Sequence, residues 1–98
     1  MQKSIAKDPE LAAQVAEVLK AIAHPLRVRI IAVLVDGPQH VNALAEMLDA
    51  KQAVVSQQLR ILRMRSLVSV ARENGFAYYR LAEPNLQQMI QCMEGCRL

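Results

Sequence analysis

The chain has 98 residues, of which 53% are hydrophobic and 3% aromatic, and it carries a formal net charge of +3. This length allows one domain, residues 1–98, with an aliphatic core. Two cysteines are too few for a disulfide scaffold. Residues 1–8 are too short and polar for a secretory signal, and no apolar run reaches the roughly 18 residues of a membrane span. We therefore expect a cytoplasmic protein with no membrane partner.

The first predicted helix covers residues 9–23. Asp8 supplies a carboxylate that can cap it, and Pro9 occupies the first helical position, where no backbone N–H is needed. Apolar residues follow at helical spacing, among them Leu11 and Val15. This pattern predicts an amphipathic helix with one apolar face.

The second predicted helix covers residues 25–35. It begins at Pro25, because a residue that precedes proline is pushed out of the helical region. We interpret that residue, His24, as a cap or turn residue. The sequence that follows is apolar almost throughout, with Arg27 and Arg29 at its exposed start. A buried strand is the alternative, but about ten residues behind a proline favour an enclosed helix.

Two further helices are predicted over residues 41–48 and 52–65, with only a short connection between them. The first of these has His40 or Asn42 as its N-terminal cap. A pair of helices joined so closely is typical of a helix-turn-helix.

The helix predicted over residues 52–65 has two chemically different faces. Val55, Leu59 and Leu62 share one face, at a spacing of i, i+4 and i+7. The other side carries amide, hydroxyl and guanidinium groups, which can bond to base edges and phosphates. These groups belong to Gln52, Ser56, Gln57, Arg60 and Arg63. We therefore interpret this helix as a DNA-recognition helix.

After the fourth helix the periodicity changes from helical to alternating. Asn74 and Gly75 stand between two alternating runs, the first of which ends near Arg72. An Asn-Gly pair in this setting is a strong signal for a β-hairpin. A hairpin that directly follows a helix-turn-helix predicts a wing, here over residues 67–82.

The last predicted helix covers residues 84–96. Cys92 and Cys96 are one helical turn apart, at the edge of an apolar stripe. The stripe consists of Leu86, Met89, Ile90 and Met93. The chain as a whole is thus predicted to be mainly α-helical with a small β-hairpin, in the order α-α-α-α-β-β-α.

Three segments, residues 19–31, 53–68 and 72–81, carry motifs in a characteristic order. The first resembles LKALADPTRLRIL, the second AVSQHLxxLRxxGLV and the third the wing of the ArsR/SmtB family of small winged-helix repressors. The likeness extends over residues 9–92. It implies a homodimeric winged helix-turn-helix that represses an operon, binds an inverted-repeat operator in double-stranded DNA and leaves it on sensing an effector.

The resemblance also implies roles for individual residues. Arg72 would lie near the DNA backbone or the minor groove. The residues facing the major groove would be Gln52, Ser56, Gln57 and Arg60. The first and last helices would form the dimer interface, which here involves Leu11, Val15, Leu86, Met89, Ile90 and Met93.

The chain departs from the family pattern at three positions. Lys51 stands where a serine often caps the recognition helix, so either Asp49 caps that helix or Lys51 contacts phosphate. Gln58 stands where histidine is common, and Ser66 where glycine is common. These differences leave the expected fold unchanged and the base preference open.

The family senses effectors through several kinds of site. Residues 41–48 contain no cysteine for a soft-metal site, and the last helix has no histidine for a zinc-type site. Cys92 and Cys96 could chelate a thiophilic ion such as As(III), if a third sulfur or the second subunit completes the site. Reactive sulfur or an oxidant is an alternative effector. A winged helix with no effector at all is another, and none of these readings requires a cofactor.

The sequence contains no catalytic constellation. It has no Ser/His/Asp set, no paired carboxylates and no phosphate-binding loop, and the spacing of Cys92 and Cys96 is not that of a Cys-x-x-Cys redox pair. We therefore expect a DNA-binding protein and not an enzyme.

Overall fold

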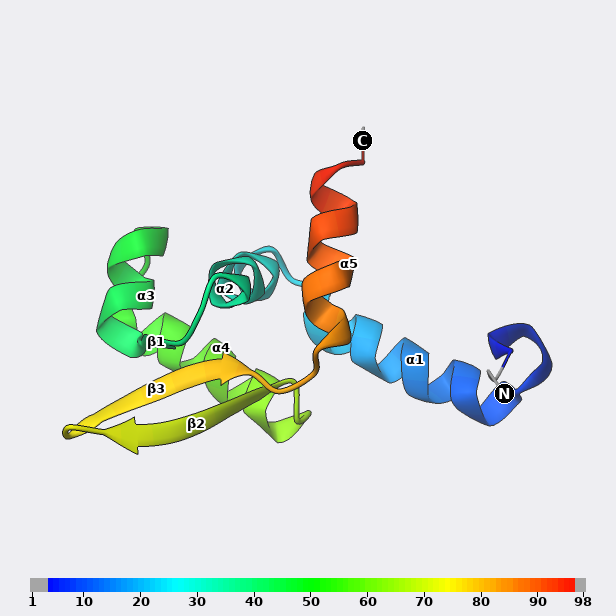
Figure 1. Cartoon of the computed structure of the whole chain (residues 1–98), viewed down its shortest axis with the longest axis horizontal. Helices are drawn as coiled ribbons and strands as arrows, with labels where there is room; N and C mark the ends of the chain where they lie inside the picture. The colour runs from blue at the N-terminus through cyan, green and yellow to red at the C-terminus, as the bar shows by residue number, and fades with distance from the viewer. Residues whose placement is uncertain (1–3, 97–98) are drawn as a thin grey trace.

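The computed structural model describes residues 4–96 and confirms the winged helix-turn-helix, mainly helical with a small antiparallel sheet (Figure 1). The ends of the predicted domain, residues 1–3 and 97–98, lie outside the described residues. In chain order the elements are η1 (Ile5–Lys7), α1 (Pro9–Ile22), α2 (Pro25–Val35), β1 (Gln39–His40), α3 (Val41–Leu48), α4 (Gln52–Met64), β2 (Val68–Glu73), β3 (Phe76–Leu81) and α5 (Asn85–Glu94).

Side chains cap the first three α-helices at their N-termini. Asp8 Oδ1 accepts a hydrogen bond of 3.0 Å from a backbone N–H in the first turn of α1. His24 Nδ1 does the same for α2 at 3.2 Å, and His40 Nδ1 for α3 at 3.3 Å. Each bond satisfies an N–H that has no partner inside its helix. Both histidines therefore act as caps, as their positions predicted.

The wing is an antiparallel hairpin of β2 and β3, in which Val68 lies opposite Leu81. Asn74 and Gly75 form the turn, with φ angles of 52° and 82°. Two consecutive residues with positive φ are required by a type I′ turn, which matches the twist of the strands and favours Asn followed by Gly.

The sheet also contains a strand that the sequence did not predict. β1 pairs with β3, placing Gln39 opposite Tyr79 and His40 opposite Tyr78. The His40 ring stacks on Phe76, with ring centroids 5.5 Å apart. These contacts attach the wing to the first turn of α3. A strand of two residues is too short to leave an alternating pattern in the sequence.

α2 lies at the centre of the core and contacts α3, α4, α5 and β3. Ile30 and Ile31 on this helix are 0% exposed, which confirms the enclosed helix. The other buried apolar residues are Ala21, Ile22, Leu34, Leu44, Leu48, Val55, Leu59, Leu62, Leu67, Val68, Leu86 and Ile90. Among residues 4–96, no helix is both long and apolar enough to cross a membrane.

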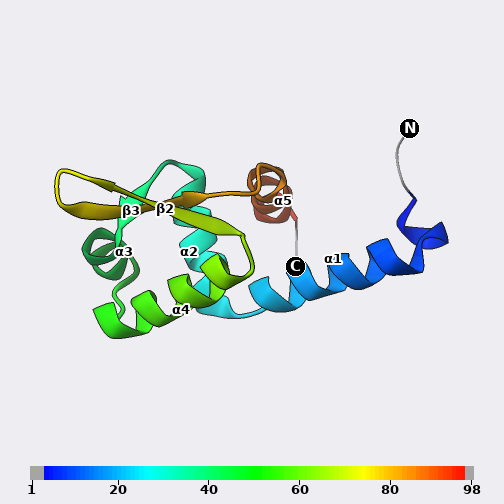
Figure 2. The ribbon, with the colours of Figure 1, turned by 90° about the horizontal axis from the view of Figure 1, so that it is seen from below.

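α1 extends away from the rest of the molecule, as both views of the ribbon show (Figures 1 and 2). Only Ala21 and Ile22 of its 14 residues are buried. At the other end of the chain, α5 stops at Glu94 and has Gly95 as its C-cap. The predicted helix continued to residue 96, so Cys96 follows α5 instead of lying in its last turn. Glycine is a poor helix former, because its backbone loses more conformational freedom in a helix than that of other residues, so a helix is easily ended at it.

Candidate nucleic-acid interface

α4 packs with its apolar face inward. Val55, Leu59 and Leu62 are each 0% exposed, as their spacing predicted. The opposite side of the helix is therefore in solvent. The exposed residues on that side and at the helix start are Lys51, Gln52, Ser56, Gln57, Arg60 and Arg63.

The N-terminus of α4 differs from those of the capped helices. Lys51 is the N-cap residue, and within residues 4–96 its side chain makes no capping hydrogen bond. Asp49 ends α3 as its C-cap, with a φ of 50°, so the alternative that Asp49 caps the recognition helix is wrong. The uncapped N–H groups of α4 and the exposed ammonium of Lys51 together favour an anion at this end.

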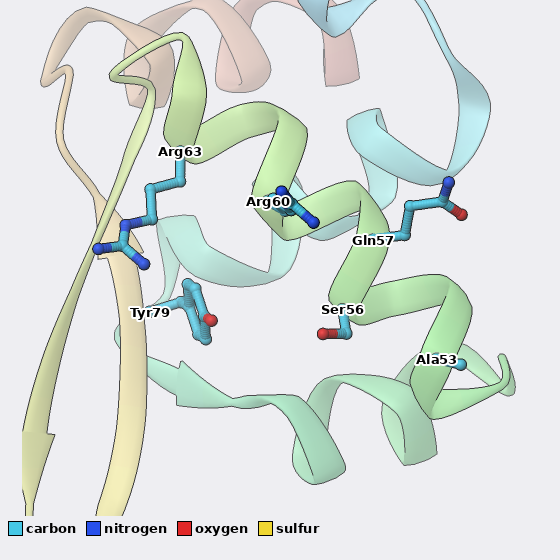
Figure 3. A pocket seen from close by; sticks show the side chains of 6 residues that line it. All are labelled: Ala53, Ser56, Gln57, Arg60, Arg63 and Tyr79. Atoms are coloured by element: carbon cyan, nitrogen blue, oxygen red, sulfur yellow. The ribbon is translucent and has the colours of Figure 1, made fainter.

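A groove of about 460 Å³ separates α4 from the middle strand of the sheet (Figure 3). Its lining brings together hydroxyl, amide and guanidinium groups, which are the donors and acceptors that bind base edges and phosphates. The lining residues are Ala53, Ser56, Gln57, Arg60 and Arg63 on α4, and Tyr79 on β3. Four residues predicted for DNA binding therefore share one concave surface.

Tyr79 is a groove residue that the sequence did not single out. It lies on β3, between Gln39 of β1 and Val70 of β2, and its half-buried ring packs against the core. Figure 3 shows this ring across the groove from Ser56. The alternating pattern places Tyr79 on one face of the wing, but the docking of α4 decides that this face borders the groove.

The remaining predicted DNA contacts lie outside the groove. Lys51 and Gln52 are at the start of α4. Arg72 is exposed on β2, opposite Ala77 and next to the tip of the wing. The polar and basic surface therefore has three parts: the groove, the start of α4 and the wing.

Gln58, by contrast, points inward and is the buried polar side chain among residues 4–96, at 8% exposure. Its Oε1 accepts a hydrogen bond of 2.7 Å from Arg27 Nε, and Arg27 Nη1 donates to the Ala21 carbonyl at 3.1 Å. Arg27 is consequently half-buried, and the expectation that it is exposed is wrong. Helical spacing from Val55 and Leu62 could have placed Gln58 on the inner face.

A second groove, of about 600 Å³, lies between α1 and α5 and is lined mainly by apolar residues. It contains four of the six residues predicted for the dimer interface: Leu11, Val15, Leu86 and Met89. Leu86 and Ile90 are 3% and 4% exposed and belong to the chain's own core, so little of their surface remains for a partner. Met93 is 48% exposed.

Cys92 and Cys96 are free, exposed thiols at the end of α5. Cys92 lies in the last turn of the helix, and the Sγ of Cys96 donates a hydrogen bond of 3.4 Å to the Cys92 carbonyl. In the part of the chain that the structure describes, no three or more His, Cys, Asp or Glu residues are grouped to hold a metal ion. The two thiols alone are thus an incomplete site for an ion that prefers three sulfur ligands.

Residues 24–70, which include α2 to α4 and the start of the wing, match the family model for "Bacterial regulatory protein, arsR family". The chain is 38% identical over 82 residues to the biofilm growth-associated repressor of Agrobacterium fabrum, a stretch that covers 84% of this chain and 70% of that protein.

Two solved structures resemble this fold. The crystal structure of the transcriptional repressor BigR from Xylella fastidiosa has a TM-score of 0.85 and 28% identity, covering 98% of this chain and 100% of that one. The solution structure of a homodimeric winged helix-turn-helix DNA-binding domain from Mycobacterium bovis, a possible ArsR-family regulator, has a TM-score of 0.77 and 29% identity, covering 95% and 84%. These relatives are DNA-binding regulators and not enzymes. On both sequence and fold, the chain belongs to the ArsR/SmtB family of winged-helix, DNA-binding transcriptional repressors.

Proposed function

We propose that this chain acts as a homodimer that represses transcription by binding an inverted-repeat operator, and that an effector at Cys92 and Cys96 releases it. The observation that carries the proposal is the groove beside α4, where Ser56, Gln57 and Arg60 are exposed next to the wing. The proposed role in binding DNA implies a cytoplasmic protein.

The two classes of DNA contact come from different parts of the surface. Gln57 and Arg60 carry the amide and guanidinium groups that discriminate bases in the major groove. Lys51, Arg63 and Arg72 are exposed cations around them, and such cations bind phosphates with little regard to sequence. In this arrangement the cations set the affinity for any DNA, whereas Gln57 and Arg60 set the preference for one operator.

The dimer is supported by the surface that α1 leaves uncovered. Leu11 and Val15 line an apolar groove toward α5, and Val18 and Leu19 are 37% and 51% exposed. A helix that projects from the domain with its apolar residues uncovered gains stability when a second copy covers them. The relative from Mycobacterium bovis is itself homodimeric. Two copies joined through α1 and α5 would present two recognition helices about one duplex turn, roughly 34–36 Å, apart.

Selection from a random library of duplexes tests DNA binding. The wild-type chain should enrich an inverted repeat, and Gln57→Ala or Arg60→Ala should weaken binding to it by about 1–3 kcal/mol. Binding to a scrambled duplex of equal length, the control, should change much less, because phosphate contacts are retained. If no duplex is enriched, or if both variants bind the selected and scrambled duplexes as the wild type does, the recognition role of α4 is wrong.

The proposed effector site consists of Cys92 and Cys96. Their thiolates are preferred ligands for a thiophilic ion such as As(III), and both side chains are exposed. The third ligand must come from the other subunit or from a small thiol. Because Gly95 separates Cys96 from the end of α5, binding that draws the two sulfurs together would reshape the last turn of α5, beside the proposed dimer surface. The altered dimer would then hold its recognition helices at the wrong separation for the operator.

A titration of the selected duplex with protein, repeated with arsenite, polysulfide and a mild oxidant, identifies the effector. We expect arsenite to lower the affinity of the wild-type chain but not that of the Cys92→Ser, Cys96→Ser variant. A response to polysulfide or oxidant alone would replace As(III) by reactive-sulfur or redox sensing. If all three leave both proteins unchanged, the cysteines are not a sensor and the chain binds DNA without these effectors.

A further inference from the structure

The guanidinium group of Arg27 connects three helices at one point in the molecule. Arg27 lies in the first turn of α2, its Nη1 bonds the Ala21 carbonyl in the last turn of α1, and its Nε bonds Gln58 in the middle of α4. The first of these helices carries the proposed dimer surface and the last carries the proposed recognition residues. The two surfaces are therefore joined by two consecutive hydrogen bonds.

The hydrogen bond from Arg27 to Gln58 would cost much to break, so it holds the two side chains in fixed relative positions. Gln58 is 8% exposed and the donor is a charged group at 2.7 Å, so loss of the bond would leave a buried amide oxygen without a donor. A second link between α1 and the end of α4 is the ion pair of Glu17 with Arg65, the C-cap residue of α4, at 3.7 Å with side chains 52% and 56% exposed. Exposed ion pairs of this kind contribute little.

A shift of α4 would move all its groove residues at once. Ser56 and Gln57 immediately precede Gln58, and Arg60 follows it. Because successive base pairs are about 3.4 Å apart along the duplex, a rotation or slide of α4 by a fraction of that distance misplaces every base contact together. The contacts tolerate only small errors, on the order of 0.5 Å.

We propose that Arg27 and Gln58 are positioning residues that fix α4 relative to α1, and so set the half-site spacing that the dimer accepts. Neither residue needs to touch DNA. The inference rests on the proposed function, since spacing has meaning only for a dimer that binds two half-sites. It assigns specificity to a hydrogen bond on the inner face of the recognition helix, in addition to the contacts on its outer face.

The test uses the full chain and duplexes derived from the inverted repeat that the wild type selects. The central spacer is lengthened or shortened by one base pair, and a scrambled duplex of equal length is the reference. Gln58→Met keeps the side-chain volume and removes the acceptor, and Arg27→Met keeps the apolar stem and removes the donor. Gln58→Glu retains an acceptor for Arg27 and is the rescue variant. Glu17→Gln removes the exposed ion pairs of Glu17 with Arg65 and Lys20 and is the matched control.

We expect Gln58→Met and Arg27→Met each to reduce the ratio of selected to scrambled affinity by about tenfold. The double variant should show no larger reduction than either single variant, because each substitution already breaks the same hydrogen bond. The affinities of these variants should also vary less with spacer length than those of the wild type. Gln58→Glu and Glu17→Gln should retain the wild-type ratio and spacing profile, and sedimentation should show the wild-type dimer for all of them. If Gln58→Met does not fold, as judged by circular dichroism, Arg27→Met carries the same test.

If Arg27→Met keeps the wild-type ratio of selected to scrambled affinity and the wild-type dependence on spacer length, the inference is wrong and the proposed function stays intact. A loss in Gln58→Glu as large as in Gln58→Met would have the same meaning, because the retained acceptor would then have no effect. A wild-type chain that enriches no duplex overturns the proposed function, and this inference with it.

Discussion

α1 and α4 are amphipathic helices of similar length, 14 and 13 residues, but their apolar faces differ in how far the rest of the chain buries them. The apolar residues Val55, Leu59 and Leu62 of α4 are completely buried by the rest of the chain. α1 leaves Val18 and Leu19 exposed and is buried only at its C-terminal end. An apolar face thus predicts that something covers it, but not whether the cover is the same chain or another. The apolar face beneath the proposed DNA-binding surface is covered within one copy of the chain, whereas the apolar face of α1 is not.

The largest effect should come from charges placed on the uncovered side. Leu11→Asp combined with Val15→Asp should give a monomer, because two carboxylates would be buried without partners. The affinity for the selected inverted repeat should fall by about 10²–10⁴-fold, since the two half-sites would no longer be bound as a unit. Sedimentation equilibrium and DNA titration measure the two effects. Ala13→Asp with Ala16→Asp, two exposed positions on α1, is the matched control, and a stable dimer in the first variant would remove α1 from the interface.

Substitutions in the buried apolar face of α4 should lower the stability of each chain by itself. Leu59→Ala should lower the free energy of unfolding by about 2–5 kcal/mol, because it opens a cavity under α4. Leu19→Ala in the monomeric background should change it by no more than about 0.5 kcal/mol, since Leu19 is 51% exposed. Urea unfolding followed by circular dichroism gives both values. Equal losses at the two positions would show that the two helices are covered alike.

A smaller effect is expected where the wing meets the helix-turn-helix. His40→Ala removes the cap of α3, the stacking on Phe76 and the edge contact with Tyr78, and should cost about 1–2 kcal/mol of unfolding free energy. His24→Ala removes only the cap of α2 and should cost less, about 0.5–1 kcal/mol. Thermal unfolding of the two variants measures both losses. If His24→Ala costs as much as His40→Ala, the aromatic contacts of His40 add little to its cap.

The smallest effect should be that of one phosphate contact. Arg63→Ala should weaken binding to selected and scrambled duplexes alike and reduce the slope of log K against log salt by about 0.9. Affinity measured between 50 and 200 mM salt provides the slope. Lys7→Ala, in η1 before α1, should leave it unchanged. A change confined to the selected duplex would instead identify Arg63 as a base contact.

Much of this fold could be predicted from local sequence. Asp8 and the two histidines cap the helices they precede, and Asn74 with Gly75 forms the predicted hairpin turn. In each case the signal and the structure that it specifies lie within a few residues of each other. The polar face of α4 was also predictable, because a helix brings residues three and four apart to the same side.

What could not be predicted depends on elements that are distant in sequence. Arg27 and Gln58 are 31 residues apart, and neither one alone indicates the other as its partner. Tyr79 borders the groove because α4 is docked beside β3, and β1 exists because Gln39 and His40 lie along the edge of the wing. The end of α5 is a different case, because its signal is local: the helix ends at Glu94, directly before Gly95, and not at residue 96 as predicted.

The amino-acid sequence by itself determined the positions of the helices and the wing, the polar face of α4 and the family. These properties follow from local backbone preferences and from the spacing of apolar residues. The tertiary structure alone decided which apolar faces are covered, that Gln58 bonds Arg27, and that Tyr79 completes the groove. Burial and hydrogen bonding depend on the neighbours that a side chain meets, and those neighbours are fixed only when the helices and the sheet pack together.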